Sequence, residues 1–216
     1  MSAPPPTEVR GPDLSGELLH ARSIVAARLP LRTLVLGDSV AAGVDASSYA
    51  CAFPSLFADS IRSRHGVPVH LVNLSVAGFT SAHGLELAEE AARDYRPDVA
   101  IVEFGLNDLR ARQRSRRHPF ARGVQIPVET YRSNILRIAD RFRRRSGADV
   151  ILVAPFPFPG SEPYRQALAD IASRTTFVLA DVPERWSQNG NLLDSEGMHP
   201  NDAGHRIYAD TLAGLL

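Results

Sequence analysis

Residues 33–43 read Thr-Leu-Val-Leu-Gly-Asp-Ser-Val-Ala-Ala-Gly. The run Thr33–Leu36 is apolar and β-branched and does not alternate with polar residues, which is typical of a strand covered on both faces. A glycine and two small polar residues follow at once and predict a turn directly after the strand. This stretch therefore favours a parallel sheet in which polar residues gather at the carboxyl end of a buried strand.

Four further apolar runs of this kind occur along the chain, at Val69–Asn73, Val99–Phe104, Val150–Ala154 and Thr176–Ala180. Helical patterns separate and flank them, at Leu14–Arg28, Pro54–Arg64, Ser81–Tyr95, Val128–Arg145, Glu162–Arg174 and Asp202–Leu215. The alternation of strand and helix predicts an α/β fold: a three-layer α/β/α sandwich with a five-stranded parallel sheet.

The N-terminal segment differs from the rest of the chain. Residues 1–12 contain three consecutive prolines and few apolar residues, so we expect a disordered tail there and a single domain over residues 13–216. The segment has neither the basic start nor the apolar core of a secretory signal. No apolar run approaches the roughly 18 residues of a membrane helix. Together with the single cysteine, Cys51, these features predict a cytoplasmic protein.

Composition excludes several classes of function. The 216 residues are 44% hydrophobic and 22% charged, with 24 basic and 24 acidic side chains, so no net field attracts nucleic acid or an anionic membrane. One cysteine excludes an internal disulfide and multi-cysteine metal sites. Every basic residue is arginine, which excludes a lysine-ended phosphate loop, a Schiff-base lysine and a Ser-Lys dyad. We predict no metal and no cofactor.

Polar blocks follow three of the expected strands, and one more precedes the last helix. They are Gly37-Asp38-Ser39, the segment 73–80 around Gly78, Gly105-Leu106-Asn107-Asp108 and the segment 194–201 around His199. Each alone reads as an ordinary turn, loop or helix cap. Together they supply what acyl transfer through a serine requires: a nucleophile, a base and donors for an oxyanion.

In this order the blocks resemble those of the GDSL/SGNH hydrolase superfamily of esterases and lipases. The resemblance covers about Thr33 to His205, most of the chain. It implies the smaller flavodoxin-like form of the three-layer sandwich. It also implies that Ser39 is the nucleophile and His199 the general base and then the general acid. The backbone N–H groups of Ser39 and Gly78 and the side-chain amide of Asn107 would form the oxyanion hole.

The acid that orients the histidine departs from the pattern of the family. The family places an aspartate three positions before the histidine, where this chain has Glu196. Asp194, five positions before His199, is the alternative acid, and a dyad with a backbone carbonyl is a further alternative. We prefer Glu196, although its extra methylene changes its reach. Asp38 and Asp108 are expected to support the loops that carry Ser39 and Asn107.

The substrate is less constrained. Phe156 could form an apolar wall for an acyl chain or belong to a stiff turn, and Phe79 could line the same pocket. Arg110 opens an arginine-rich insert that could bind an anionic group or be a solvated loop. We predict a serine esterase that hydrolyses carboxylic esters (small acyl, carbohydrate or lipid esters) through an acyl-enzyme on Ser39. The alternatives are an acyltransferase with the same acyl-enzyme and a non-catalytic module that binds a small ligand.

Overall fold

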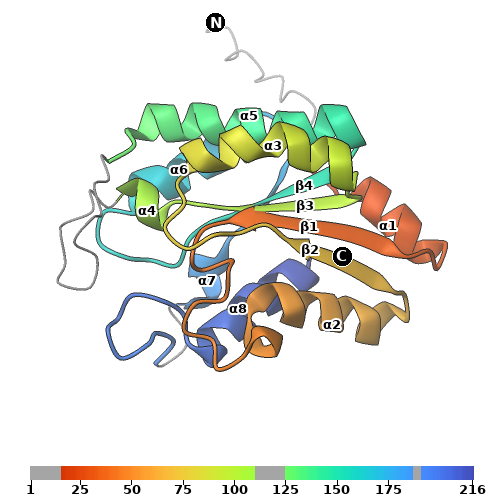
Figure 1. The fold of residues 1–216 in the computed structure, drawn as a ribbon, viewed down its shortest axis with the longest axis horizontal. Coiled ribbons are helices and arrows are strands. Elements are labelled where there is room, and N and C mark those ends of the chain that lie inside the picture. The colour runs from red at the N-terminus through yellow and green to blue at the C-terminus, as the bar shows by residue number, and fades with distance from the viewer. Residues whose placement is uncertain (1–15, 110–124, 187–190) are drawn as a thin grey trace, which may run out of the picture.

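The computed structural model describes residues 16–109, 125–186 and 191–216. The predicted tail and Arg110 lie outside these residues. Five strands form one sheet in the order β2-β1-β3-β4-β5, and every pair is parallel (Figure 1). They are β1 (Leu31–Gly37), β2 (Val69–Asn73), β3 (Val99–Glu103), β4 (Asp149–Val153) and β5 (Val178–Ala180). The predicted fold class is confirmed, and the strand order is that of flavodoxin-like proteins.

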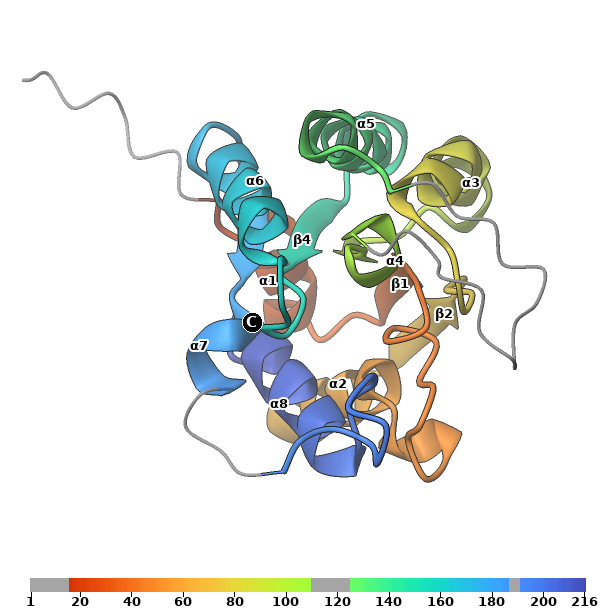
Figure 2. The same cartoon turned by 90° about the vertical axis from the view of Figure 1, so that its left-hand side faces the viewer.

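Helices cover both faces of the sheet, as Figure 2 shows from the end of the sheet. The core on one face is completed by α1 (Leu19–Ala26), α2 (Phe53–His65), α7 (Val182–Trp186) and α8 (Asp202–Ala213). The core on the other face is completed by α3 (Ser81–Tyr95), α5 (Val128–Ser146) and α6 (Glu162–Ser173). In the described parts of the chain, no helix is long and apolar enough to cross a bilayer.

The two cores explain why the first four residues of β3 are all apolar. In β3, Val99 and Ile101 point into the core on the α2 face, and Ala100 and Val102 point into the core on the α3 face. Successive side chains of a strand alternate between faces, so a strand covered on both sides carries apolar residues at every position.

The ends of the helices follow ordinary capping chemistry. The Asn201 side chain accepts hydrogen bonds from the backbone N–H groups of Ala203 and Gly204 at the start of α8. Thr80 and His83 form a reciprocal capping box at the start of α3. Both caps matter for function because Thr80 belongs to the polar segment 73–80 and Asn201 to the polar segment 194–201.

The order of the strands reverses between β1 and β3, and we call the region beyond the carboxyl ends of these two strands the crevice. From β1 the chain moves to β2 on one side and then returns to β3 on the other. Ligands of open α/β sheets bind at such a reversal, beyond the carboxyl ends of the strands. Two short elements that the sequence did not predict follow the strands here: η1 (Tyr49–Cys51), after β1, and α4 (Leu106–Leu109), after β3. Figure 2 faces the side on which α4 lies.

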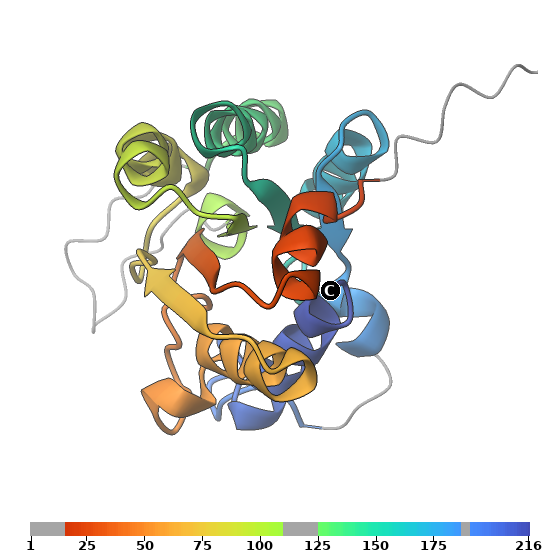
Figure 3. The same ribbon diagram turned by 90° about the vertical axis from the view of Figure 1, so that its right-hand side faces the viewer.

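At the amino ends of the strands, ion pairs and hydrogen bonds join the sheet to α1. The Asp98 carboxylate accepts hydrogen bonds from the backbone N–H and the guanidinium of Arg32, and it pairs with His20 of α1. Asp149 accepts the backbone N–H of Ala21 at 2.9 Å. The C-terminal end lies beside α1 (Figure 3), where the Leu215 carbonyl accepts a hydrogen bond from Arg22 at 3.1 Å.

Candidate active site

Ser39 lies in the first turn after β1, at the crevice, and its side chain is almost fully buried. The turn closes on itself, since the backbone N–H of Val44 donates to the Ser39 carbonyl at 3.0 Å. Asn73, at the end of β2, donates its amide to the Ala41 carbonyl at 2.8 Å and so ties the turn to the neighbouring strand. The hydroxyl is therefore held by a packed turn.

His199 reaches this hydroxyl from the loop before α8. Its Nε2 atom lies 3.0 Å from Ser39 Oγ, so the residues predicted as nucleophile and base are in hydrogen-bond contact although 160 positions separate them. Asp194 shapes the loop by accepting the backbone N–H groups of Met198 and His199 at 2.7 and 3.2 Å. Burial alone would raise the pKa of Asp194, but these backbone hydrogen bonds outweigh it and hold the pKa below its usual value.

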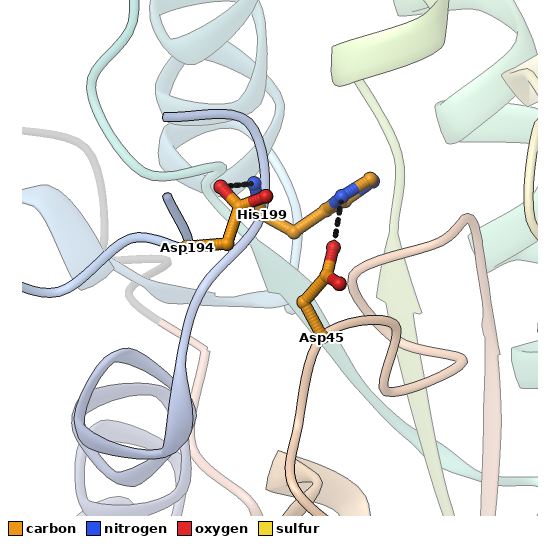
Figure 4. A group of neighbouring side chains, drawn as sticks. All are labelled: Asp45, Asp194 and His199. Carbon is orange, nitrogen blue, oxygen red and sulfur yellow. Dashed lines mark hydrogen bonds and ion pairs between the residues drawn. The ribbon is translucent and has the colours of Figure 1, made fainter. Parts of the chain in front are cut away.

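The acid beside the histidine ring requires a correction. Oδ2 of Asp45 lies 2.8 Å from His199 Nδ1, and Asp45 belongs to the turn after β1 (Figure 4). We expected Glu196, or else Asp194, in this position. Asp194 instead bonds to the backbone of the histidine loop, as Figure 4 shows. Since the carboxylate accepts from Nδ1–H, Nε2 is left as the acceptor for the hydroxyl of Ser39.

The two remaining donors expected for the oxyanion lie on adjoining loops. Gly78 has a backbone φ of +88°, which a residue with a side chain rarely adopts. The Asn107 side-chain amide donates to the carbonyl of Phe79, the next residue, at 2.9 Å. One amide hydrogen of Asn107 therefore ties the two loops together, and the amide carries a second hydrogen that can donate to a ligand.

Asp108 fastens the Asn107 loop to α3. Both oxygens of its buried carboxylate accept the backbone N–H of Ser81, the first residue of α3, and one also accepts the Ser81 hydroxyl. Asn134 of α5 donates to the same hydroxyl. Burial raises the pKa of Asp108 to about 6, although its hydrogen bonds oppose the shift. The contact agrees with the supporting position expected for this residue.

Asp38 and Glu103 form a buried pair of carboxyl groups beneath the serine. Both side chains are fully buried, and one oxygen of Asp38 accepts the backbone N–H of Val40 at 2.9 Å. The other three carboxyl oxygens have no hydrogen-bond partner of normal geometry among the described residues. Gly37 permits the close approach of β1 to Glu103, because a Cβ atom at position 37 would lie 2.5 Å from the Glu103 carbonyl oxygen.

Burial raises the pKa of Asp38 to about 7, and burial together with the neighbouring Asp38 raises the pKa of Glu103 as well. A proton shared between the two groups would give one oxygen of each group a hydrogen-bond partner. Asp38, which we predicted to support the loop that carries Ser39, would thus link this loop through Glu103 to the end of β3.

The three residues predicted to contact the substrate have different outcomes. Phe156 is 1% exposed and stacks on Trp186 with ring centroids 5.1 Å apart, so it belongs to the core and cannot line a binding surface. Phe79 is half-buried and stacks on His83 of α3. Arg110 lies outside the described residues.

Among the described residues, one group of side chains has the spacing of a metal site. It consists of Asp45, Asp194 and His199, whose ligand atoms lie within 4.8 Å of one another. Both ring nitrogens of His199 are already engaged by Asp45 and Ser39. The cluster is therefore accounted for by the hydrogen bonds that align the histidine.

Comparison with known proteins agrees with this geometry. The model of the GDSL-like lipase/acylhydrolase family matches residues 35–207, from β1 into α8. The chain belongs to this family. Membership in a family of acylhydrolases identifies it as a carboxylic-ester hydrolase. A curated relative, thioesterase 1/protease 1/lysophospholipase L1 of Escherichia coli K12, is 27% identical over 189 residues, covering 85% of this chain and 82% of its own.

Solved structures show the same fold for this family member. The crystal structure of TesA superposes with a TM-score of 0.70 at 22% identity, covering 86% of this chain and 99% of that chain. A catalytic mutant of the acetylxylan esterase Axe2 from Geobacillus stearothermophilus gives a TM-score of 0.70 at 17% identity, with 86% and 93% coverage.

Proposed function

We propose that this family member hydrolyses carboxylic esters through an acyl-enzyme on Ser39, with His199 as the base. The observation that carries the proposal is the unbroken hydrogen-bond chain from Ser39 Oγ to His199 Nε2 and from Nδ1 to a carboxylate. A nucleophile in contact with a base that a third group orients is the signature of covalent catalysis by serine.

In the first half of the reaction, Ser39 Oγ attacks the ester carbonyl carbon while its proton passes to His199 Nε2. The carbonyl oxygen becomes an oxyanion. The backbone N–H groups of Ser39 and Gly78 and the second amide hydrogen of Asn107 would donate hydrogen bonds to it. When the intermediate collapses, the bond to the alcohol oxygen breaks and the imidazolium returns the proton to the leaving alcohol. The acyl group stays on Ser39.

In the second half, water replaces the alcohol. His199 takes a proton from the attacking water, the same donors receive the second oxyanion, and the proton returns to Ser39 as the carboxylic acid leaves. Each half forms one imidazolium and then returns it to neutral imidazole, so the cycle closes without an external acid or base. An acyltransferase would differ only in the nucleophile of this half, and we favour hydrolysis because the named relatives include a thioesterase and an acetylxylan esterase. The cytoplasmic location stays a prediction.

Ser39→Ala tests the chemistry. We expect kcat/KM on p-nitrophenyl esters, from acetyl to long-chain, to fall by at least about 10⁴-fold, because removing a serine nucleophile abolishes the acyl-enzyme route. A fluorophosphonate should add one adduct to the wild type, detected by intact mass, and none to Ser39→Ala. The acyl length that reacts fastest reports the size of the acyl site.

Ser173→Ala is the matched control, since Ser173 is exposed at the end of α6 and its hydroxyl donates to the local Asp170 carbonyl. It should behave as wild type. Equal ester hydrolysis by wild type and Ser39→Ala would overturn the proposal.

A further inference from the structure

We propose that Asp45, in the turn after β1, is the positioning residue that orients His199. This inference rests on the proposed function and assigns the third member of its hydrogen-bond chain. It means that nucleophile and acid lie six positions apart in one turn, while the base comes from the other end of the chain. The direct observation is the 2.8 Å contact between Asp45 Oδ2 and His199 Nδ1.

The backbone of Asp45 is the second observation. It has φ of +65°, and among the described non-glycine residues only Arg28 and Arg96 share a positive φ. Those two follow the C-terminal ends of α1 and α3, where a left-handed residue commonly terminates a helix. Asp45 ends no helix. A left-handed backbone away from a helix end persists where other contacts determine it, and such positions cluster at functional sites.

Contacts on both sides of Asp45 determine its position. Before it, the Val44 N–H donates to the Ser39 carbonyl, which binds the acid to the turn of the nucleophile. After it, the backbone N–H and the hydroxyl of Ser47 both donate to the Asp202 carboxylate, at 2.7 and 2.6 Å. The backbone on either side of Asp45 is therefore anchored, and its side chain is directed toward the ring of His199 (Figure 4).

The same anchor holds the histidine. Asp202 is the first residue of α8 and follows His199 by three positions, so the Ser47 contact joins the acid loop to the base loop. The hydrogen bonds from Ser47 outweigh the effect of burial and hold the pKa of Asp202 below its usual value. Farther along α8, buried His205 lies 3.5 Å from the Val44 carbonyl. The separation of Asp45 and His199 is thus fixed by α8.

Asp194, the nearest competing carboxylate, performs a different task. Its Oδ1 accepts two backbone N–H groups of the histidine loop, so it shapes the chain that carries His199. Asp45 acts on the ring itself. A carboxylate on Nδ1 selects the tautomer in which Nε2 can accept the proton of Ser39, and it stabilises the imidazolium that results.

Asp45→Asn is the sharpest test. We expect kcat on a p-nitrophenyl ester to fall about 10²-fold while KM changes less than about threefold, because an amide can select the wrong tautomer without altering substrate binding. The loss is smaller than at a buried triad because Asp45 is 43% exposed and water screens its charge. Asp45→Glu should recover part of the rate, since this exposure leaves space for one methylene.

A spectroscopic measurement reads the same contact without a substrate. In the wild type, the Nδ1 proton of His199 should appear as a downfield resonance in the one-dimensional proton spectrum. It should be lost in Asp45→Asn and in His199→Ala, and kept in Ser39→Ala. A merely structural role of Asp45 would not predict this pattern.

The matched control is Asp59→Asn, an exposed carboxylate on α2 that pairs with Arg62, and it should keep wild-type kcat and the downfield resonance. Glu196→Gln should reduce kcat less than Asp45→Asn does. A larger loss in Glu196→Gln, or retention of the resonance in Asp45→Asn, overturns the assignment. If no ester is hydrolysed by the wild type, the proposed function fails, while the resonance and the rate of fluorophosphonate labelling still decide the role of Asp45.

Discussion

Asn107 carries two amide hydrogens with different tasks. One donates to the Phe79 carbonyl, and we propose that the other donates to the oxyanion. We expect Asn107→Ala to lower kcat by about 10²–10³-fold, the usual cost of losing one such donor, with little change in KM. Steady-state kinetics on the best ester substrate measures both constants.

Asn107→Asp separates the donor from the shape of the side chain. It keeps the size of asparagine but offers only acceptor oxygens to a developing negative charge, so its kcat should be no higher than that of Asn107→Ala. An active Asn107→Asp variant would contradict the assignment of this residue to the oxyanion hole.

The residues of the site were predictable where strand ends determine them. Ser39, Gly78 and Asn107 lie in the loops that follow β1, β2 and β3, so finding the strands also finds the loops that carry these residues. Asp45 was missed because the acid was sought by its distance in sequence from His199. Its only signal is its place in the turn of Ser39, and the backbone that directs its side chain depends on contacts 155 positions away.

Phe156 shows the opposite error. It follows β4 and could have faced either the crevice or the core. The choice is made by Trp186, on which its ring stacks, and by the Tyr208 hydroxyl, which accepts its backbone N–H. Neither partner is close in sequence, so no local pattern could predict the outcome.

The ends of β1 and β3 are joined by the buried pair of Asp38 and Glu103, and this pair makes stability depend on pH. Both carboxyl groups have a raised pKa in the folded chain, so the folded state binds more protons than the unfolded chain above about pH 4. The stability they contribute is present in acid and is lost as pH rises through about 7, the folded-state value of Asp38. We expect Glu103→Gln to flatten the fall of Tm between pH 5 and 8, since it removes one of two buried acids.

Scanning calorimetry over that pH range measures this effect. Glu129→Gln, at an 83% exposed position on α5, is the control and should keep the wild-type slope. A wild-type slope in Glu103→Gln would contradict a buried, proton-sharing pair.

Two elements have the bounds that the sequence predicted, and three short helices were not predicted. β2 and α3 begin and end at the predicted residues. η1, α4 and α7 were missed, because three to five residues are too few to show a helical period. β1 extends two residues earlier than predicted, since the charged Arg32 is held in the strand by its bonds to Asp98.

The predicted site residues and the Asp98 ion pairs lie at opposite ends of the sheet. The crevice and its raised carboxyl pKa values lie at the carboxyl ends of the strands, and Asp98 lies at the amino ends. Burial would raise the pKa of Asp98, but hydrogen bonds from Arg32 and His20 outweigh it and hold the pKa below its usual value. This contribution to stability is present above about pH 4 and is lost as pH falls. The two ends therefore respond to pH in opposite directions.

Asp98→Ala should destabilise the protein by about 2–4 kcal/mol, because Arg32 loses the buried acceptor of its backbone N–H and guanidinium. We expect kcat at 25 °C to be unchanged, since the site lies at the other end of the sheet. Chemical denaturation and ester kinetics on the same preparation measure both quantities.

Asp59→Ala, which removes an exposed carboxylate that pairs with Arg62, is the control and should change the unfolding free energy by less than about 0.5 kcal/mol. A loss of kcat in Asp98→Ala without a loss of stability would show that the two ends are coupled.

The position of the C-terminus has a practical consequence. α8 starts three residues after His199 and runs 12 residues away from it, about 18 Å, to an end held by Arg22 and Arg64. A tag or surface linker added after Leu216 would thus leave from the back of the molecule (Figure 3). An immobilised preparation coupled in this way would present every catalytic crevice to the flowing medium, so activity per molecule on the support should equal that in solution.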